Sequence, residues 1–283
     1  MPVKLAMIQA SSLILPDDNL QKAERLIRQA AAEGGQIICL QELFMSPYFC
    51  RSVDESNFSL SEPVPGPVTG RLAKLAKKYG IVLVIPVFER QAAGIYYNTA
   101  AVVDADGSYL GKYRKMHIPE DPGFLEKYYF TPGDIGYKVF NTRFGRLGTL
   151  ICYDQWYPEA ARQTALLGAD ILIYPTAIGS LPHETGEVTA GYIDAWQTIQ
   201  RSHAIANGCF VASVNRVGTE DNIEFWGRSF ACGPFGQIIC EGGQGEEIIY
   251  ADCDFDSIEA HRHDWPFFRD RRTDSYGENK GRT

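Results

Sequence analysis

Four segments of the chain repeat one pattern, in which apolar residues at helical spacing give way to a glycine and then to a short apolar run. The first of these helices begins at Asp17 or Asp18, which we expect to cap it, and it ends at Gly34 and Gly35. The other expected helices are residues 69–79, 159–167 and 195–207, and the apolar runs that follow the four helices are residues 36–40, 81–88, 170–174 and 209–215. Helices that alternate with short buried strands are typical of an α/β fold.

Two further segments alternate apolar and polar residues around a turn and therefore predict β-hairpins. Residues 96–115 turn at residues 104–107, and residues 227–240 turn at residues 233–236. Each half of the chain thus contains two helix–strand units and one hairpin, a weak internal duplication that is compatible with two similar sheets packed together. No linker interrupts the pattern, so we expect a single domain over residues 1–283. From about residue 257 the chain is polar and aromatic and shows no core face.

The charge balance and the cysteine pattern exclude several classes of protein. The 283 residues include 27 Lys or Arg and 35 Asp or Glu, so the formal net charge of −8 disfavours a nucleic-acid partner. The 7 cysteines are odd in number and form no C-x-x-C pair, which disfavours a disulfide framework or a zinc site and favours a reducing compartment. The longest apolar run is much shorter than the ~20 residues of a membrane span, and no signal-peptide pattern opens the sequence. We therefore expect a cytoplasmic protein without a membrane partner.

Three of the expected strands end at side chains that can act together chemically. Glu42 follows residues 36–40, Lys115 closes the first hairpin, and Cys152 ends another apolar run. Open α/β folds place their sites at the carboxyl ends of strands. A helix opened by Pro158 favours ionisation of a nearby thiol, a carboxylate can take its proton, and an ammonium can stabilise an oxyanion. Taken singly, each residue has a simpler interpretation, as a buried thiol or a solvated surface charge.

The residues around these three side chains resemble the motifs of the nitrilase superfamily, the carbon–nitrogen hydrolases with a Glu–Lys–Cys triad. The matching stretches are residues 40–44 (LQELF), 113–119 (YRKMHIP) and 148–154 (GTLICYD). The resemblance covers nearly the whole chain and implies a four-layer α-β-β-α sandwich of two packed sheets with helices outside. It also implies thiol-dependent hydrolysis of a non-peptide C–N bond with no metal and no other cofactor, and a homo-oligomer built from dimers.

By position, the resemblance implies that Cys152 is the nucleophile, Glu42 the general base and Lys115 the oxyanion stabiliser. Glu126, within residues 124–134 (FLEKYYFTPGD), matches the second glutamate of the family, whose role would be to orient Lys115 and the substrate amide. The simpler interpretation of Glu126 is a helix-face partner of a nearby lysine.

Within the superfamily, the chain resembles the branch that hydrolyses N-carbamoylputrescine to putrescine, CO2 and ammonia. The shared stretches are residues 112–119, 128–134, 154–162, 174–180 and 268–272. D-amino-acid carbamoylases carry arginines where this chain has Gln155 and Trp156, so we expect a substrate without a carboxylate. Trp156 either packs against an alkyl chain or a cation of the substrate or belongs to the core. The backbone N–H of Tyr153, which would complete the oxyanion site, and the side chain of Tyr48 are further expected contacts.

One position departs from that branch, because Leu181 stands where an acidic residue usually meets the distal ammonium. Glu184 or Glu187 in the same loop can take over this role, or both are solvated loop charges. The alternatives are therefore an ω-amidase, a β-ureidopropionase or an N-carbamoyl amino acid hydrolase, and, in a different class, a non-catalytic protein that binds amides or polyamines. The aromatic residues after position 257 fit packing against a partner subunit.

Overall fold

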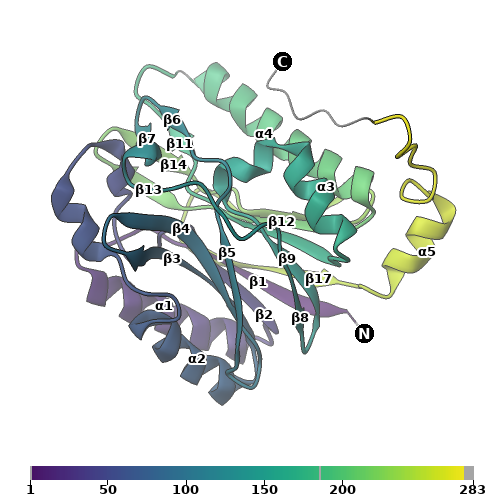
Figure 1. The fold of residues 1–283 in the computed structure, drawn as a ribbon, viewed down its shortest axis with the longest axis horizontal. Coiled ribbons are helices and arrows are strands. Elements are labelled where there is room, and N and C mark those ends of the chain that lie inside the picture. Colours follow the sequence, from purple (N-terminus) through teal and green to yellow (C-terminus); the bar gives the residue numbers. More distant parts are fainter. Residues whose placement is uncertain (1, 185, 277–283) are drawn as a thin grey trace.

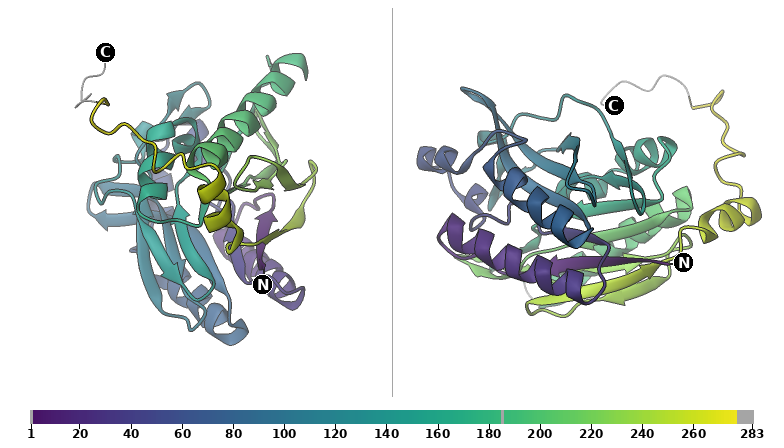
Figure 2. Two further views of the ribbon diagram at one scale, coloured as in Figure 1. Left: turned by 90° about the vertical axis from the view of Figure 1, so that its right-hand side faces the viewer. Right: turned by 90° about the horizontal axis from the view of Figure 1, so that it is seen from below.

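Two six-stranded sheets pack face to face in the computed structural model, which describes residues 2–184 and 186–276 (Figure 1). Helices α1 (Pro16–Ala32) and α2 (Pro67–Tyr79) lie against the first sheet. Helices α3 (Pro158–Leu166) and α4 (Gly186–Asn207) cover the second sheet. The right view of Figure 2 shows α1 and α2 side by side on the outer face of the first sheet. The predicted four-layer sandwich is therefore confirmed.

The two sheets repeat one topology. The first has the order β17 (Glu247–Cys253), β1 (Val3–Gln9), β2 (Ile37–Leu40), β3 (Val82–Ala92), β4 (Ile95–Val103), β5 (Tyr109–Arg114). The second has the order β8 (Val139–Thr142), β9 (Gly145–Thr149), β10 (Ile171–Pro175), β12 (Phe210–Val214), β15 (Phe230–Cys232), β16 (Ile238–Glu241). In each, three parallel strands are flanked by one antiparallel strand on one side and two on the other. The duplication expected from the sequence is thus present.

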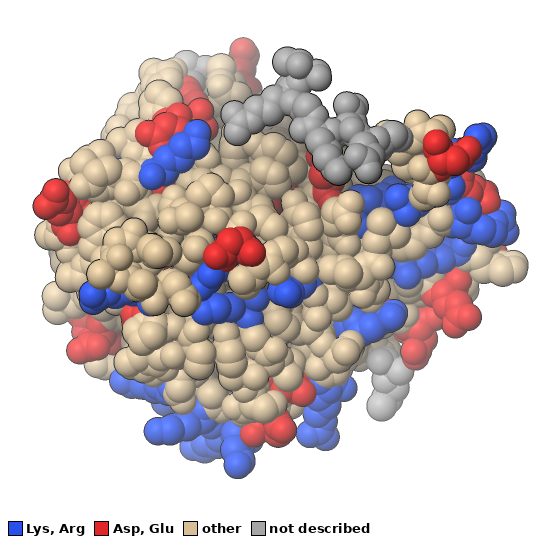
Figure 3. Space-filling model, in the orientation of Figure 1, with Lys and Arg blue, Asp and Glu red and all other residues tan. Residues whose placement is uncertain are grey.

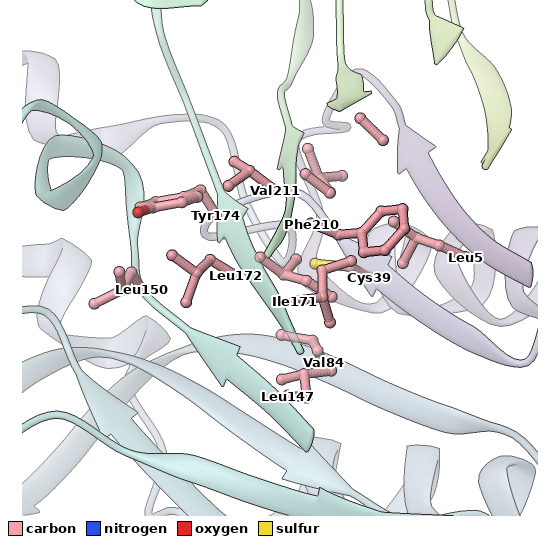
Figure 4. Packing of buried hydrophobic residues seen from close by; sticks show 14 of the residues in the cluster. Leu5, Cys39, Val84, Leu147, Leu150, Ile171, Leu172, Tyr174, Phe210 and Val211 are labelled. Atoms are coloured by element: carbon pink, nitrogen blue, oxygen red, sulfur yellow. The ribbon is translucent and has the colours of Figure 1, made fainter. Parts of the chain in front are cut away.

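The core between the sheets is formed by alternate side chains of both. Leu5, Cys39 and Val84 project from the first sheet toward Ile171 and Phe210 of the second (Figure 4). Fully burying an aliphatic side chain of this size contributes about 1.5–3 kcal/mol. The intervening residues of β1, β2 and β3 pack against α1 and α2 instead. Because both faces of the central strands are buried, these strands read as continuous apolar runs in the sequence.

Two helix starts differ from the prediction. Asp17 and Asp18 lie in the first turn of α1 rather than at its cap, because Pro16 opens the helix and Leu15 occupies the cap position without a side-chain hydrogen bond. Helix α4 begins at Gly186 rather than at residue 195. Its first turns are mostly exposed, so they lack the apolar face on which the prediction depended.

Several short elements that the sequence analysis missed surround the carboxyl ends of the central strands. A hairpin joins β6 (Glu120–Asp121) to β7 (Phe124–Leu125), and a small sheet joins β11 (Gly179–Ser180), β14 (Ile223–Trp226) and β13 (Val217–Glu220). The labels of these strands cluster at the upper left of Figure 1. The 3₁₀ helices are η1 (Phe49–Arg51), η2 (Glu55–Leu60), η3 (Glu126–Tyr128) and η4 (Cys152–Trp156).

The C-terminal segment has a core face, contrary to the prediction. Helix α5 (Ser257–Asp264) buries Ile258, and the ring of Phe268 lies 5.2 Å from the guanidinium of Arg162 and 4.7 Å from that of Arg262. Short segments with one or two anchoring residues lack a detectable period, which explains the error. Trp265 is still 51% exposed, and α5 stands at the right-hand edge of the molecule in Figure 1 and in the right view of Figure 2. Residues 277–283 of the predicted tail lie outside the described residues.

The surface carries charges of both signs. On the face shown in Figure 3, lysines and arginines are interspersed with aspartates and glutamates, and most of the area is uncharged. None of the helices in the described part of the chain is long and apolar enough to cross a bilayer.

Candidate active site

Four chemically reactive side chains meet at the carboxyl ends of the strands. Glu42 follows β2, Lys115 follows β5, Glu126 opens η3, and Cys152 opens η4 after β9. The ammonium of Lys115 donates hydrogen bonds to Oε1 of Glu42 at 2.8 Å and to Oε2 of Glu126 at 2.7 Å. Glu42 and Lys115 are 0% exposed, Glu126 is 1% exposed, and Cys152 is 8% exposed. The structure therefore brings together all four residues predicted from the motifs.

The carboxylate of Glu42 is held with one oxygen occupied and the other without a hydrogen-bond partner among the described residues. Oε1 accepts from Nδ2 of Asn98 at 2.7 Å as well as from Lys115, whereas Oε2 is buried and unpartnered. The buried guanidinium of Arg216 donates to the backbone oxygens of Glu42 at 3.0 Å and of Leu43 at 2.9 Å, which fixes the turn after β2. An unpaired buried carboxylate oxygen is costly, so this atom is a candidate proton acceptor.

Burial and neighbouring charges determine the protonation of Lys115 and Glu126. Burial lowers the pKa of Lys115, but the carboxylates of Glu126 and Glu42 outweigh it and hold the pKa well above its usual range. Burial raises the pKa of Glu126, although Lys115 opposes that shift. The hydroxyl of Tyr48 donates to Oε1 of Glu126 at 2.7 Å. The two carboxylates thus favour the charged form of Lys115, whose ammonium also acts on the Cys152 thiol.

Cys152 occupies a sharp turn between β9 and α3. Its φ of 42° lies in the left-handed region, which costs a non-glycine residue energy and is common at functional sites. Burial raises the pKa of its thiol, Glu42 raises it further, and Lys115 only partly opposes them. The expectation that a helix N-terminus makes this thiol easy to ionise is therefore wrong, because burial and the nearby carboxylates dominate. The thiol needs a base to remove its proton.

A cavity of about 350 Å³ borders Cys152. It is lined by Pro119, Asp121, Pro122, Phe124, Cys152, Tyr153, Gln155, Trp156, Ala177, Ile178, Gly179, Leu181, His183, Glu184, Tyr192, Ala195 and Trp226. The titratable lining residues Asp121, His183 and Glu184 are exposed or half-buried, and we refer to these three as the rim. A largely apolar cavity with a few polar groups is typical of a small-molecule site.

Four of the six predicted substrate contacts line this cavity: Tyr153, Gln155, Trp156 and Glu184. Glu187 does not line it, because it is an exposed residue in the first turn of α4. Tyr48 does not line it either, since it is fully buried behind Glu126.

The side chain of Gln155 is fixed by two donors. Its Oε1 accepts from Nε1 of Trp196 at 2.9 Å and from the hydroxyl of Thr176 at 3.3 Å. Its Nε2 is buried and has no partner among the described residues. Because an indole N–H can only donate, Oε1 must face Trp196, and this sets the orientation of the Gln155 amide. The atom of this side chain left without a partner is therefore the donor Nε2 rather than an acceptor oxygen.

Sequence reasoning missed Asp121 and Asn98. Asp121 belongs to the hairpin of β6 and β7, whose turn contains Pro122 and Gly123 at a φ of 81°. Adjacent Pro and Gly are a turn signal and had the potential to reveal this hairpin. Asn98 lies within β4, and nothing in the alternation of that strand distinguishes it from a core residue.

Comparisons with known proteins agree with this geometry. The family model described as carbon-nitrogen hydrolase matches residues 4–263. The chain is 44% identical to the N-carbamoylputrescine amidase of Solanum lycopersicum, over 96% of this chain and 94% of that protein. It is 43% identical to the citrullinase of Francisella tularensis, over 98% and 97% respectively. The crystal structure of a carbon-nitrogen hydrolase from Helicobacter pylori G27 superposes with a TM-score of 0.95 at 42% identity, covering 98% of this chain and 97% of that one. The chain therefore belongs to the carbon-nitrogen hydrolase family.

Proposed function

We propose that this enzyme hydrolyses N-carbamoylputrescine to putrescine, CO2 and ammonia through a covalent intermediate on Cys152. The observation that carries the substrate proposal is the lining of the cavity. Its described residues include two carboxylates, Asp121 and Glu184, and neither Lys nor Arg. An apolar cavity with acidic groups suits an alkyl chain that ends in an ammonium, and it offers no bidentate partner to a carboxylate.

The first half of the reaction forms a bond between sulfur and carbon. Oε2 of Glu42, which has no partner among the described residues, accepts the thiol proton of Cys152. The sulfur attacks the carbamoyl carbon, and the ammonium of Lys115 stabilises the negative oxygen that develops. A backbone N–H, which we assign to Tyr153, completes the oxyanion site. One such donor typically contributes about 3–4 kcal/mol to the transition state.

The second half releases the amine. Glu42 returns its proton to the departing ammonia, which leaves a thiocarbamate on Cys152. A water molecule then attacks that carbon while Glu42 accepts its proton, and the sulfur leaves and takes the proton back. The product is the N-carboxylic acid of putrescine, which gives CO2 and the free amine as the proton of its carboxyl group moves to nitrogen. Glu126 keeps Lys115 in place through two hydrogen bonds of 2.9 and 2.7 Å.

We assign the distal ammonium to the rim. Glu184 Oε2 accepts from the backbone N–H of Leu181 at 2.6 Å, which orders the loop around it. A Cβ on Gly123 would lie 3.0 Å from the Leu181 side chain, so the hairpin that carries Asp121 packs against the loop that carries Glu184. Leu181 therefore joins the two segments, and the two carboxylates replace the acidic residue that it displaces. Trp156 lines the cavity that receives the butyl chain.

A substrate panel tests this proposal. We expect kcat/KM to be highest for N-carbamoylputrescine, lower for N-butylurea, which lacks the ammonium, and lowest for N-carbamoyl amino acids and ω-amides that carry a carboxylate. Faster hydrolysis of a carboxylate substrate would contradict the proposal and favour an ω-amidase or a β-ureidopropionase.

Citrulline is the informative competitor, because the citrullinase is as similar to this chain as the N-carbamoylputrescine amidase is. The end of citrulline that lies away from its carbamoyl group carries a carboxylate beside the ammonium. The described lining residues offer no Lys or Arg to that carboxylate. We therefore expect a lower kcat/KM for citrulline than for N-carbamoylputrescine.

We further propose that residues 1–283 form one domain that works in the cytoplasm as a homo-oligomer. The family match over residues 4–263 supports the single domain, and seven free cysteines support a reducing compartment. The exposed Trp265 and Phe267, which are 51% and 39% exposed, support burial against a partner subunit. Light scattering measures the subunit number, and a monomer would contradict this assignment.

A further inference from the structure

Lys115 and Cys152, which we propose to act on the same carbonyl group, come from different sheets. Lys115 follows β5 of the first sheet, and Cys152 follows β9 of the second. Backbone hydrogen bonds hold the strands of one sheet in register, whereas two packed sheets touch mainly through side chains. The separation between the ammonium and the thiol therefore depends on contacts that cross from one sheet to the other.

The carboxylate of Asp154 makes such a contact. Its Oδ1 accepts from the backbone N–H of His117 at 3.0 Å and is 2.7 Å from Nδ1 of the same residue. Its Oδ2 accepts from the hydroxyl of Tyr113 at 2.8 Å and from the backbone N–H of Ile151 at 3.0 Å. His117 and Tyr113 flank the proposed lysine, and Ile151 directly precedes the proposed nucleophile. One side chain thus binds both segments.

The carboxylate of Asp154 is not free to bind substrate. Both of its oxygens are occupied by these contacts, the residue is 0% exposed, and it does not line the cavity. Because an ionised carboxylate only accepts hydrogen bonds, Nδ1 of His117 carries the proton in this contact. Hydrogen bonds to a charged acceptor are about twice as strong as neutral ones, so a buried carboxylate with such donors is a rigid junction.

The ring of His117 forms a second link between the same segments. It stacks on Tyr157, with ring centroids 3.6 Å apart and planes inclined by 7°. Tyr157 directly precedes α3 and follows the turn that carries Cys152. The segment after Lys115 is therefore attached to the segment after Cys152 by both a hydrogen bond and a ring stack.

We propose that Asp154, acting with His117, is a positioning residue that sets the distance between Lys115 and Cys152. This inference rests on the roles proposed above for those two residues. Without the junction, the two sheets keep their cores, but the oxyanion donor and the nucleophile lose their fixed separation. The loss then falls on the chemical step rather than on substrate binding, because Asp154 does not contact the cavity.

The test compares Asp154→Asn with a matched control. In Asp154→Asn an amide N–H₂ replaces one acceptor oxygen and meets donors that it cannot pair with. Asp170→Asn is the control, since Asp170 is also a buried aspartate that accepts from a backbone N–H, that of Arg146 at 2.8 Å. Asp170 directly precedes β10, whereas the cavity lies beyond the other end of that strand. Tyr113→Phe removes a single donor from the junction. For each variant we measure kcat, KM, the thermal midpoint and the rate of Cys152 alkylation by iodoacetamide.

We expect Asp154→Asn to lower kcat at least 100-fold with KM within threefold of wild type, and to slow alkylation at least tenfold. Tyr113→Phe should lower kcat by less than tenfold, and Asp170→Asn should lower the thermal midpoint with kcat unchanged. A folded Asp154→Asn with kcat within threefold of wild type would overturn the inference, as would an equal loss of kcat in Asp170→Asn.

If Asp154→Asn does not fold, His117→Ala is measured instead, because this half-buried side chain is easier to replace. It should lower kcat at least tenfold with KM unchanged, and an unchanged kcat would overturn the inference. Alkylation does not require the natural substrate. Slower alkylation of the variants therefore supports positioning even if N-carbamoylputrescine is the wrong substrate.

Discussion

The buried group of Glu42, Lys115, Glu126 and Cys152, which we call the inner end of the site, and the rim of the cavity are built in opposite ways. Within this group, Cys152 is the member that lines the cavity. At the inner end, Glu42, Lys115 and Glu126 are at most 1% exposed and are bound to one another by hydrogen bonds of 2.7–2.9 Å. At the rim, Asp121 is exposed on a two-residue strand, and Glu184 is half-buried in a loop. Interactions between charges are strong at the inner end because water is excluded, whereas solvent screens the interactions of the charges at the rim.

This difference separates chemistry from substrate choice. Glu42, Lys115 and Cys152 follow strands of the two large sheets and, like Glu126, are buried, so a change there disturbs both the charge balance and the packing. The rim groups stand on short elements that can be exchanged without disturbing the sheets. Leu181 illustrates this, because the family resemblance led us to expect an acidic residue there, whereas the acidic residues that line the cavity are Asp121 and Glu184 from two neighbouring segments.

The largest effect is expected at the inner end. Cys152→Ala should reduce turnover by at least about 10⁴-fold, because no other group can form the covalent intermediate. Cys209→Ala is the matched control, since Cys209 is also a buried free thiol of the second half and should leave kcat unchanged within about twofold. Steady-state kinetics with circular dichroism as a folding control measure both variants. An equal loss of activity in folded Cys209→Ala would remove the distinction between them.

Changes at the rim should be smaller and confined to binding. Asp121→Asn combined with Glu184→Gln should raise KM for N-carbamoylputrescine about tenfold, because each exposed ion pair contributes only ~0.2–1 kcal/mol. The KM for neutral N-butylurea should stay the same, since this substrate has no ammonium and forms no ion pair with the rim. Equal effects on the two substrates would show that the rim does not read the charge.

Behind the inner end, Glu89 should affect stability more than activity. Its buried carboxylate accepts from Arg114 at 3.0 Å, from Lys112 at 2.5 Å and from Thr99 at 2.7 Å. Burial raises the pKa of Glu89, but these hydrogen bonds outweigh it and lower the pKa below its usual value. The ionised form therefore stabilises the fold above the pKa of the unfolded chain, and this contribution is lost as pH falls through the lowered pKa.

Glu89→Gln should accordingly cost about 3 kcal/mol of unfolding free energy at pH 7, because it removes the buried one of the two carboxylates that pair with Arg114 and leaves only the exposed Asp134. The difference between wild type and variant should shrink as the pH approaches 4 and below. Urea denaturation between pH 3 and 7 measures it, and a difference that does not depend on pH would contradict the assignment. KM should not change, since Glu89 does not line the cavity.

The same contrast explains which features of the site could be predicted from the sequence and which could not. Glu42, Lys115 and Cys152 directly follow short expected strands and lie in specific motifs, so their place at strand ends could be predicted and their roles could be proposed. Asp121 escaped notice because a hairpin of two-residue strands has no period. The raised pKa of the Cys152 thiol was also out of reach, since it depends on burial and on carboxylates from distant parts of the chain. The exposed start of α4 shows the same limit for helices.

The most direct test of the central claim is the mass of the enzyme during turnover. Acid quenching of the wild-type enzyme with N-carbamoylputrescine, followed by intact-protein mass spectrometry and peptide mapping, should show the mass of the substrate less ammonia on Cys152. The adduct should be absent from Cys152→Ala. An adduct on another residue, or full turnover by Cys152→Ala, would contradict the account.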